Sequence, residues 1–178
     1  MDLFSFSVDR CFGFAYNIHM EGEIDMKIYE AMIADLPSVK NIVHTAINDI
    51  YPHYYPVGAV EFFLAHHCDE NIIKDITAGN VFLLSDENGT PVGTVSVVHN
   101  EITRLFVLPE YQGKGYGGML IRFAEERIAE SFDSIIIDAS FSAKQIYLKK
   151  GYVPVKYNTI KCNGGDYLCY DVMIKKLR

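Results

Sequence analysis

Residues 111–120 of the chain read YQGKGYGGML, with four glycines in six positions. A segment with strand character, residues 101–107, precedes this stretch. Apolar residues follow it at helical spacing, namely Leu120, Phe123, Ala124 and Ile128. A glycine loop between a strand and a helix N-terminus binds phosphate well. The main-chain amides of glycine permit close approach, and the helix dipole favours an anion. The stretch therefore predicts a site for a phosphate-bearing ligand.

Two familiar phosphate loops fit this stretch poorly. A P-loop requires Ser or Thr after its Gly-Lys pair, and here Gly115 follows Lys114. A dinucleotide fingerprint is present in Gly113, Gly115 and Gly118, and Asp138 ends a predicted strand 20 residues later. However, residues 108–112 separate the strand from the first glycine, and the 40 residues after Asp138 do not form repeated βαβ units. The dinucleotide site is left as a weak alternative.

The rest of the chain alternates between strand and helix periodicity. Strands are predicted over residues 27–33, 80–84, 92–98, 101–107, 134–138, 152–162 and 167–174. Helices are predicted over residues 35–50, 60–67, 69–78 and 142–149, besides the helix that follows the glycines. These elements predict an α/β (α+β) domain, with a mixed, mostly antiparallel sheet of about six or seven strands and helices on both faces. We assign this domain to residues 26–178 and treat residues 1–25 as an N-terminal extension of uncertain role, in which residues 3–8 alternate like a strand.

Composition narrows the partners and the compartment. A net charge of −7 argues against nucleic acid, whose binding depends on clustered cations, and favours a cationic partner. No apolar run is long enough to span a membrane, and no signal peptide is evident. The cysteines lack Cys-x-x-Cys pairing and indicate reduced thiols at Cys11, Cys68, Cys162 and Cys169. We therefore expect a cytoplasmic protein with no metal, no nucleic-acid partner and no membrane partner.

Two blocks of the sequence resemble one family. Residues 107–117, VLPEYQGKGYG, resemble the acetyl-CoA loop of the GCN5-related N-acetyltransferase (GNAT) family. The signature of that loop is Gln or Arg, two residues, Gly, one residue, and Gly or Ala, and it is matched by Gln112, Gly115 and Gly117. Residues 143–152, AKQIYLKKGY, resemble that family's Ala-x-x-(Phe)-Tyr-x-Lys-x-Gly-(Phe) segment, in which both Phe positions are optional. The resemblance covers about residues 27–175. It implies the GNAT fold and the transfer of an acetyl group from acetyl-CoA to an amine.

The resemblance also implies a binding site for acetyl-CoA. Main-chain amides of residues 112–118 would wrap the pyrophosphate, and residues 105–107 would bind the pantetheine arm as if it were an added strand. The implied cofactor-binding residues are Leu105, Phe106, Val107, Gln112, Gly113, Lys114, Gly115, Tyr116, Gly117 and Gly118. Ser140 stands where many relatives have Asn, so a shorter donor is expected to hold the cofactor less tightly. A plain helix-entry turn is the alternative, although it does not require four glycines.

Two residues are implied to carry the chemistry. An amine with a pKa of about 10 must lose a proton before it can attack. Glu101 lies 14 residues before Gly115, where histone-acetylating relatives carry a base, and would act directly or through water; a surface glutamate would look the same. A main-chain N–H near Val107 could stabilise the thioester oxygen. Tyr147 stands at the family position of the donor that protonates the departing thiolate, although a core aromatic would also fit there.

The acceptor side is predicted from the segment between the first two helices. Its aromatic residues could form a wall for a cation or a packed loop, and they are Tyr51, His53, Tyr54 and Tyr55. The predicted function is acetyl transfer to a primary amine, either a small cationic amine such as a polyamine or a protein amino group. The alternative is a non-catalytic module that binds and senses acyl-CoA. Retention of Glu101 and Tyr147 favours the enzyme, and dimerisation is left open.

Overall fold

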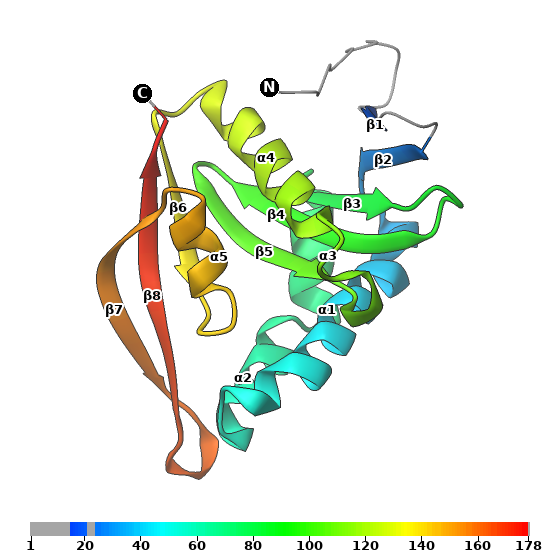
Figure 1. Ribbon diagram of the computed structural model, residues 1–178. Coiled ribbons are helices and arrows are strands. Elements are labelled where there is room, and N and C mark those ends of the chain that lie inside the picture. The colour runs from blue at the N-terminus through cyan, green and yellow to red at the C-terminus, as the bar shows by residue number, and fades with distance from the viewer. Residues whose placement is uncertain (1–14, 21–23, 178) are drawn as a thin grey trace.

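The computed structural model describes residues 15–20 and 24–177, and side chains from residue 26 onward. The strand predicted over residues 3–8 lies outside the described residues. Within the described part, one sheet contains eight strands in the order β1-β2-β3-β4-β5-β6-β8-β7 (Figure 1). Their bounds are Ala15–Met20 for β1, Ile24–Glu30 for β2, Val81–Ser85 for β3, Pro91–Val98 for β4, Glu101–Val107 for β5, Ser134–Ala139 for β6, Val153–Lys161 for β7 and Tyr167–Lys176 for β8.

The pairing confirms the predicted fold class. Among the strands of the described residues, only β5 and β6 are parallel, and every other neighbouring pair is antiparallel. The eighth strand, β1, falls within the segment that the sequence had assigned to an extension. It pairs with β2 along its length, from Ala15 opposite Tyr29 to Met20 opposite Ile24. The sheet therefore reaches into residues 1–25, while the boundary at residue 26 stays a prediction.

Helices cover both faces of the sheet, as predicted. On one face lie α1 (Leu36–Ile50), α2 (Val57–His66) and α3 (Asp69–Thr77), and on the other lie α4 (Tyr116–Ala129) and α5 (Lys144–Lys149). Single 3-10 turns occupy Ile33–Asp35, Tyr51–His53, Pro109–Tyr111 and Asn163–Gly165. The α1 helix forms because its buried residues share one face, namely Val39, Ile42, Val43, Ala46 and Ile47. The α2 helix begins earlier than predicted because the extended Pro56 serves as its N-cap.

Two hydrophobic cores result, one on each face. Residues of α4 and α5, including Leu120, Phe123 and Tyr147, pack in the first core. Residues of α1, α2 and α3, including Ile47, Ala59 and Ile72, pack in the second. The same strands therefore contribute side chains to both layers, as expected of a sheet covered on both sides. None of the helices in the described residues is both long and apolar enough to cross a membrane.

The parallel pair β5–β6 creates the feature that positions the site. Its register contains two residue pairs, Glu101 with Ile136 and Ile102 with Ile137. Beyond these pairs β5 continues into the glycine loop, whereas β6 continues alongside β8. In Figure 1, β6, β8 and β7 accordingly turn away from β5. The remainder of β5 thus has a strand neighbour on one side only.

Candidate active site

A cavity of about 760 Å³ opens where β5 and β6 diverge. It is lined by β5, the glycine loop, the start of α4, the end of β6, α5, α2 and part of β8. The cavity gathers most of the residues singled out from the sequence: Tyr51, Tyr54, Glu101, Leu105, Phe106, Val107, Gln112, Gly113, Gly115, Gly117, Gly118, Ser140 and Tyr147. Residues that lie far apart in the chain therefore meet around one space.

Two cofactor candidates lie outside this lining. The Lys114 ammonium group sits 5.0 Å from the centre of the Tyr111 ring. The Tyr116 ring packs at 5.9 Å from the same tyrosine. Both residues lie between glycines of the turn without lining the cavity, and their contact with a phosphate stays a prediction.

The aromatic segment after α1 is divided between packing and the cavity. Tyr51 is buried and Tyr54 is exposed, and both line the cavity. His53 is exposed and does not line it. Tyr55 does not line it either: its hydroxyl donates to the Cys169 carbonyl at 3.2 Å and accepts from the main-chain N–H of Phe141 at 2.8 Å. Tyr55 therefore ties the loop after β6 to β8, and the packed-loop interpretation describes this residue.

The main chain of β5 offers hydrogen-bonding groups to the cavity. The N–H of Leu108 donates to the Val92 carbonyl of β4 at 2.9 Å. Because the groups of alternate residues point to opposite sides of an antiparallel strand, those of Leu105 and Val107 face away from β4. The Gln112 side chain donates to the Val107 carbonyl at 2.9 Å and so fixes the start of the loop against the strand. An extended ligand could pair with the groups that remain, as an added strand would.

The glycine turn is shaped for close approach of a ligand. Gly113 and Gly115 have φ values of 76° and 92°, a region that favours glycine. A Cβ added at either position would meet no protein atom within 4 Å, so the space beside them is open. Gly115 is the N-cap of α4, whose first-turn N–H groups and dipole attract an anion. The turn therefore has the geometry of an anion-binding site.

A buried tyrosine of α5 lies in the cavity wall. Tyr147 is 4% exposed, and its ring packs edge-on against Tyr152 at 5.5 Å. Burial raises the pKa of Tyr147, and the neighbouring Tyr51 raises it further. Burial also raises the pKa of Tyr51, although a side-chain hydrogen bond with Ser140 lowers it. Both hydroxyls therefore keep their protons at neutral pH, and Tyr147 is at once a core residue and a cavity residue.

Two carboxylates meet at the other end of the cavity. Burial raises the pKa of Glu101, and the charge of Asp138 raises it further. Burial likewise raises the pKa of Asp138, whereas the ammonium group of Lys156 lowers it. The sequence indicates Asp138 only as part of the dinucleotide fingerprint. The parallel register of Glu101 with Ile136 was the missing signal, because it places Asp138 just beyond Glu101 on the adjacent strand.

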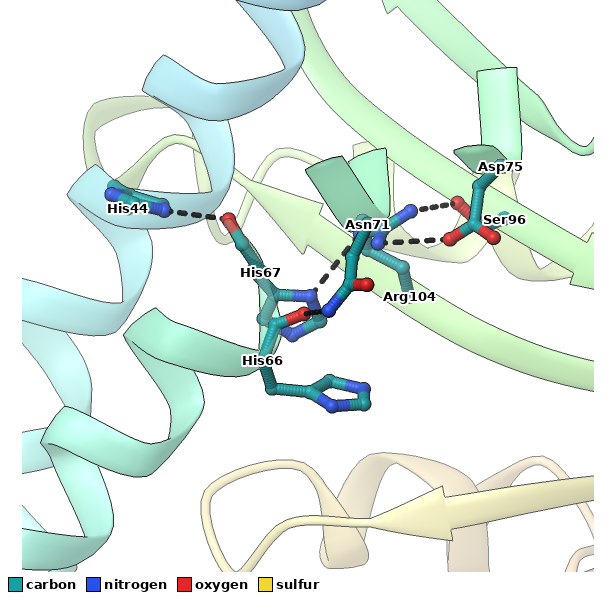
Figure 2. Close-up of polar contacts among 7 residues, drawn as sticks. All are labelled: His44, His66, His67, Asn71, Asp75, Ser96 and Arg104. Carbon is teal, nitrogen blue, oxygen red and sulfur yellow. Dashed lines mark hydrogen bonds and ion pairs between the residues drawn. The ribbon is translucent and has the colours of Figure 1, made fainter. Parts of the chain in front are cut away.

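A polar cluster that the sequence did not reveal borders the same cavity. Figure 2 shows Arg104 of β5 between His67, at the end of α2, and Asp75 of α3. The guanidinium group donates to His67 Nδ1 at 3.3 Å, to Ser96 Oγ at 2.8 Å and to Asp75 Oδ2 at 3.1 Å. Strand alternation indicates only that Arg104 shares a face with Phe106, because the register with β4 shifts between Ser96 and Val97 and Ile102 packs in the opposite core. Across the described residues, no group of three or more His, Cys, Asp or Glu side chains is gathered as a metal site would need.

Comparisons with known proteins indicate the family of the chain. A family model described as an acetyltransferase (GNAT) domain matches residues 50–170. An uncharacterized N-acetyltransferase of Escherichia coli strain K12, YafP, is 30% identical over 96 residues. That match covers 54% of this chain and 61% of YafP, so the chain spans less than two thirds of this relative.

Solved structures share the fold. The crystal structure of a GCN5-related N-acetyltransferase from Rhodopseudomonas palustris, also described as a class-II aminotransferase, superposes with a TM-score of 0.76 and 26% identity, covering 89% of this chain and 99% of that one. The PaiA N-acetyltransferase of Thermoplasma acidophilum, solved in complex with coenzyme A, gives a TM-score of 0.65 at 18% identity, covering 85% and 99%. The second likeness concerns the fold alone.

Proposed function

Since the chain belongs to the GNAT family of acetyltransferases, we propose that it transfers an acetyl group from acetyl-CoA to a primary amine. One observation carries the proposal. A single cavity joins an open glycine turn, the free edge of β5, a buried tyrosine hydroxyl and a carboxylate of raised pKa. These are the parts needed to hold a thioester and to move protons on either side of it.

The cofactor would lie along β5 and the glycine turn. The amides of residues 113–118 would hold its pyrophosphate, and the outward main-chain groups of Leu105 and the carbonyl of Val107 would hold its pantetheine arm. When bound, acetyl-CoA supplies an acetyl group activated as a thioester. Ser140 lies in the cavity wall, but its hydroxyl is engaged with Ser142 at 3.0 Å and with Tyr51. We therefore give Ser140 a minor share in cofactor binding.

Glu101 would remove the proton of the acceptor ammonium group, directly or through a water molecule. A base works best when its pKa is close to the working pH, and burial together with Asp138 raises the pKa of Glu101 in that direction. Asp138 would further favour a cation at this end of the cavity. The two carboxylates thus attract the protonated amine, and one of them prepares it for attack.

Tyr147 would supply the proton that the departing sulfur atom needs. Its pKa is raised, so the hydroxyl is protonated at neutral pH and acts as a donor. The main-chain N–H of Val107, which faces away from β4, would donate to the oxygen that gains charge as the amine adds. The acid, Tyr147, therefore lies on α5, and the base, Glu101, lies on β5. Two separate groups are needed because one proton leaves the amine and another reaches the sulfur atom.

We propose that the acceptor is a small cationic amine such as a polyamine, or a protein amino group. The net charge of −7 and the carboxylates of Glu101 and Asp138 support a cationic acceptor. A cytoplasmic location is part of the proposal and is supported by the free thiols of Cys68, Cys162 and Cys169. The alternative is a module that binds acyl-CoA without turnover. Thiol release from acetyl-CoA in the presence of an amine panel tests the choice, because a binding module releases none above background hydrolysis.

A further inference from the structure

His67 is held rigidly by its own main chain. Its N–H donates to the Phe63 carbonyl at 3.1 Å, where α2 ends. Its carbonyl accepts a hydrogen bond from His44 Nε2 of α1 at 2.8 Å (Figure 2). The ring packs edge-on against Phe106 at 5.4 Å and His66 at 5.0 Å. The imidazole therefore has a fixed position in the wall of the cavity.

The Arg104 contact decides where the hydrogen of the His67 ring resides. A guanidinium group is always protonated and only donates, so Nδ1 must be the acceptor of the 3.3 Å bond from Arg104 Nε. The bonds to Ser96 and Asp75 prevent Arg104 from turning away. Burial first, and then the charge of Arg104, lowers the pKa of His67 to about 3. At neutral pH the ring is therefore neutral and carries its hydrogen on Nε2.

This Nε2–H opens into the cavity. His67 is 4% exposed and belongs to the cavity lining. Among the described residues, no protein group accepts a hydrogen bond from Nε2. Nor is Nε2 among the fully enclosed side-chain atoms that lack a hydrogen bond in that part of the chain, so it is accessible. The acceptor for this donor must therefore come from whatever fills the cavity, whether water or a ligand.

The wall around this donor is largely apolar. Phe106 packs against the ring, and the lining of the same cavity also includes Phe62, Phe63, Ile160, Leu168 and Tyr170. The charged groups that face His67 are those of Arg104 and, through it, Asp75, while His66 and His44 lie beside the ring and also lower its pKa. A neutral donor backed by a guanidinium group favours an oxygen acceptor over a second cation. An ammonium group is unsuited to this position because it has no lone pair.

On the basis of the proposed function, we propose that His67 Nε2–H donates a hydrogen bond to an oxygen of the acceptor substrate. The accepted amine would then also carry a carbonyl group. This selects between the two acceptor classes above: an amino group of a peptide or an amino-acid amide provides such an oxygen, whereas a polyamine does not. Arg104 is the positioning residue that sets the tautomer. The aromatic lining indicates that the body of the substrate is apolar.

The test compares two amines that differ by one carboxamide, L-phenylalaninamide and β-phenylethylamine. Their affinities for the protein saturated with coenzyme A would be measured by calorimetry in the wild type, His67→Asn and His67→Gln. Asparagine can place its carbonyl near the position of Nδ1 and keep the Arg104 bond, but it has no donor near Nε2. Glutamine can place its amide N–H near Nε2. The two variants therefore separate the donor from the structural role of His67.

We expect His67→Asn to lose about 3- to 10-fold of the preference for the amide, and His67→Gln to retain most of it. Comparing the ratio of the two affinities between variants cancels the intrinsic difference between the amines and any general loosening of the cavity. An unchanged ratio in His67→Asn overturns the proposal. Thiol release from acetyl-CoA is followed with the same two amines. If neither amine causes release, but the ratio of their affinities still changes in His67→Asn as expected, the proposed function is contradicted and this inference is not.

A second measurement needs no variant. In nitrogen-15 spectra of the wild type loaded with coenzyme A, His67 should show the signature of a neutral ring protonated at Nε2. Addition of L-phenylalaninamide should shift the Nε2 resonance, and β-phenylethylamine should shift it much less. A ring protonated at Nδ1, or equal shifts with the two amines, overturns the proposal.

Discussion

Glu101 and Asp138 project from neighbouring parallel strands into one cavity, and the charge of Asp138 adds to burial in raising the pKa of Glu101. If Glu101 is the base, kcat/KM must fall as the pH drops through its pKa. Asp138→Asn removes a negative charge, which lowers the pKa of Glu101, so the acidic limb of the pH profile should move to lower pH. The limb should stay above that of an ordinary glutamate because burial remains.

The pH profile of kcat/KM for one amine in the wild type and in Asp138→Asn checks this expectation. Glu101→Gln should abolish the limb and lower the rate, whereas Glu110→Gln, at an exposed residue outside the cavity, should leave the profile unchanged. A limb that stays in place in Asp138→Asn, or that persists in Glu101→Gln, would assign the base to another group.

Gly115→Val should weaken coenzyme A binding by about 10-fold or more. Valine fills the open space beside the turn and resists the φ of 92°, so the main-chain N–H groups can no longer approach the pyrophosphate. Gly89→Val is a matched control, because Gly89 has a φ of 78° and open space but lies in the turn between β3 and β4. Both variants should lose similar stability, and calorimetry should find weakened binding only in Gly115→Val. Equal affinities in the two would remove the glycine turn from the cofactor site.

Tyr147→Phe should lower kcat by about 10- to 1,000-fold, the usual size of an acid–base contribution, with little change in the affinity for acetyl-CoA. The substitution keeps the buried ring and removes only the hydroxyl. Tyr152→Phe makes the same change in the adjacent ring, which does not line the cavity, and should retain activity. Turnover of Tyr147→Phe at the wild-type rate would leave Tyr147 as a core residue only.

His67 should make the fold sensitive to acid. Its folded pKa of about 3 lies below the value of 6.5 for a free histidine, so the unfolded chain binds a proton first as the pH falls. The contribution of neutral His67 to the free energy of unfolding is complete above a pH of about 6.5, and it is lost progressively as the pH falls to about 3. Denaturant unfolding should therefore show that the wild type loses up to about 2 kcal/mol more than His67→Asn between pH 7 and 5. Parallel losses in the two proteins would show that His67 titrates normally.

Local signals explain which parts of the molecule were predictable. The helix of residues 36–50 follows from its apolar spacing, and the glycine turn follows from its composition. Contacts between distant residues leave no such signal. The Arg104–His67 bond joins residues 37 positions apart, and the Tyr55–Cys169 bond joins residues 114 positions apart. The role of Tyr55 in packing and the tautomer of His67 therefore became evident only from the fold.

The strand β1 shows a second kind of limit. Its residues pair with β2 through main-chain groups, which any sequence offers, so nothing in the segment distinguishes a sheet strand from an appendage. The divergence of β5 from β6 was similarly absent from the sequence, because it depends on β6 pairing with β8 and not on the residues of β5. The family resemblance supplied the cavity residues where local patterns could not.

The most direct test of acetyl transfer is the release of free thiol from acetyl-CoA, followed in the presence of spermidine, a lysine-containing peptide, L-phenylalaninamide and a neutral arylamine at low and high salt. We expect amine-dependent release that is matched by acetylated product, with cationic acceptors favoured over the neutral arylamine and their advantage reduced at high salt. Tight binding of acetyl-CoA without thiol release for any amine above background hydrolysis would contradict the enzyme and identify a binding module.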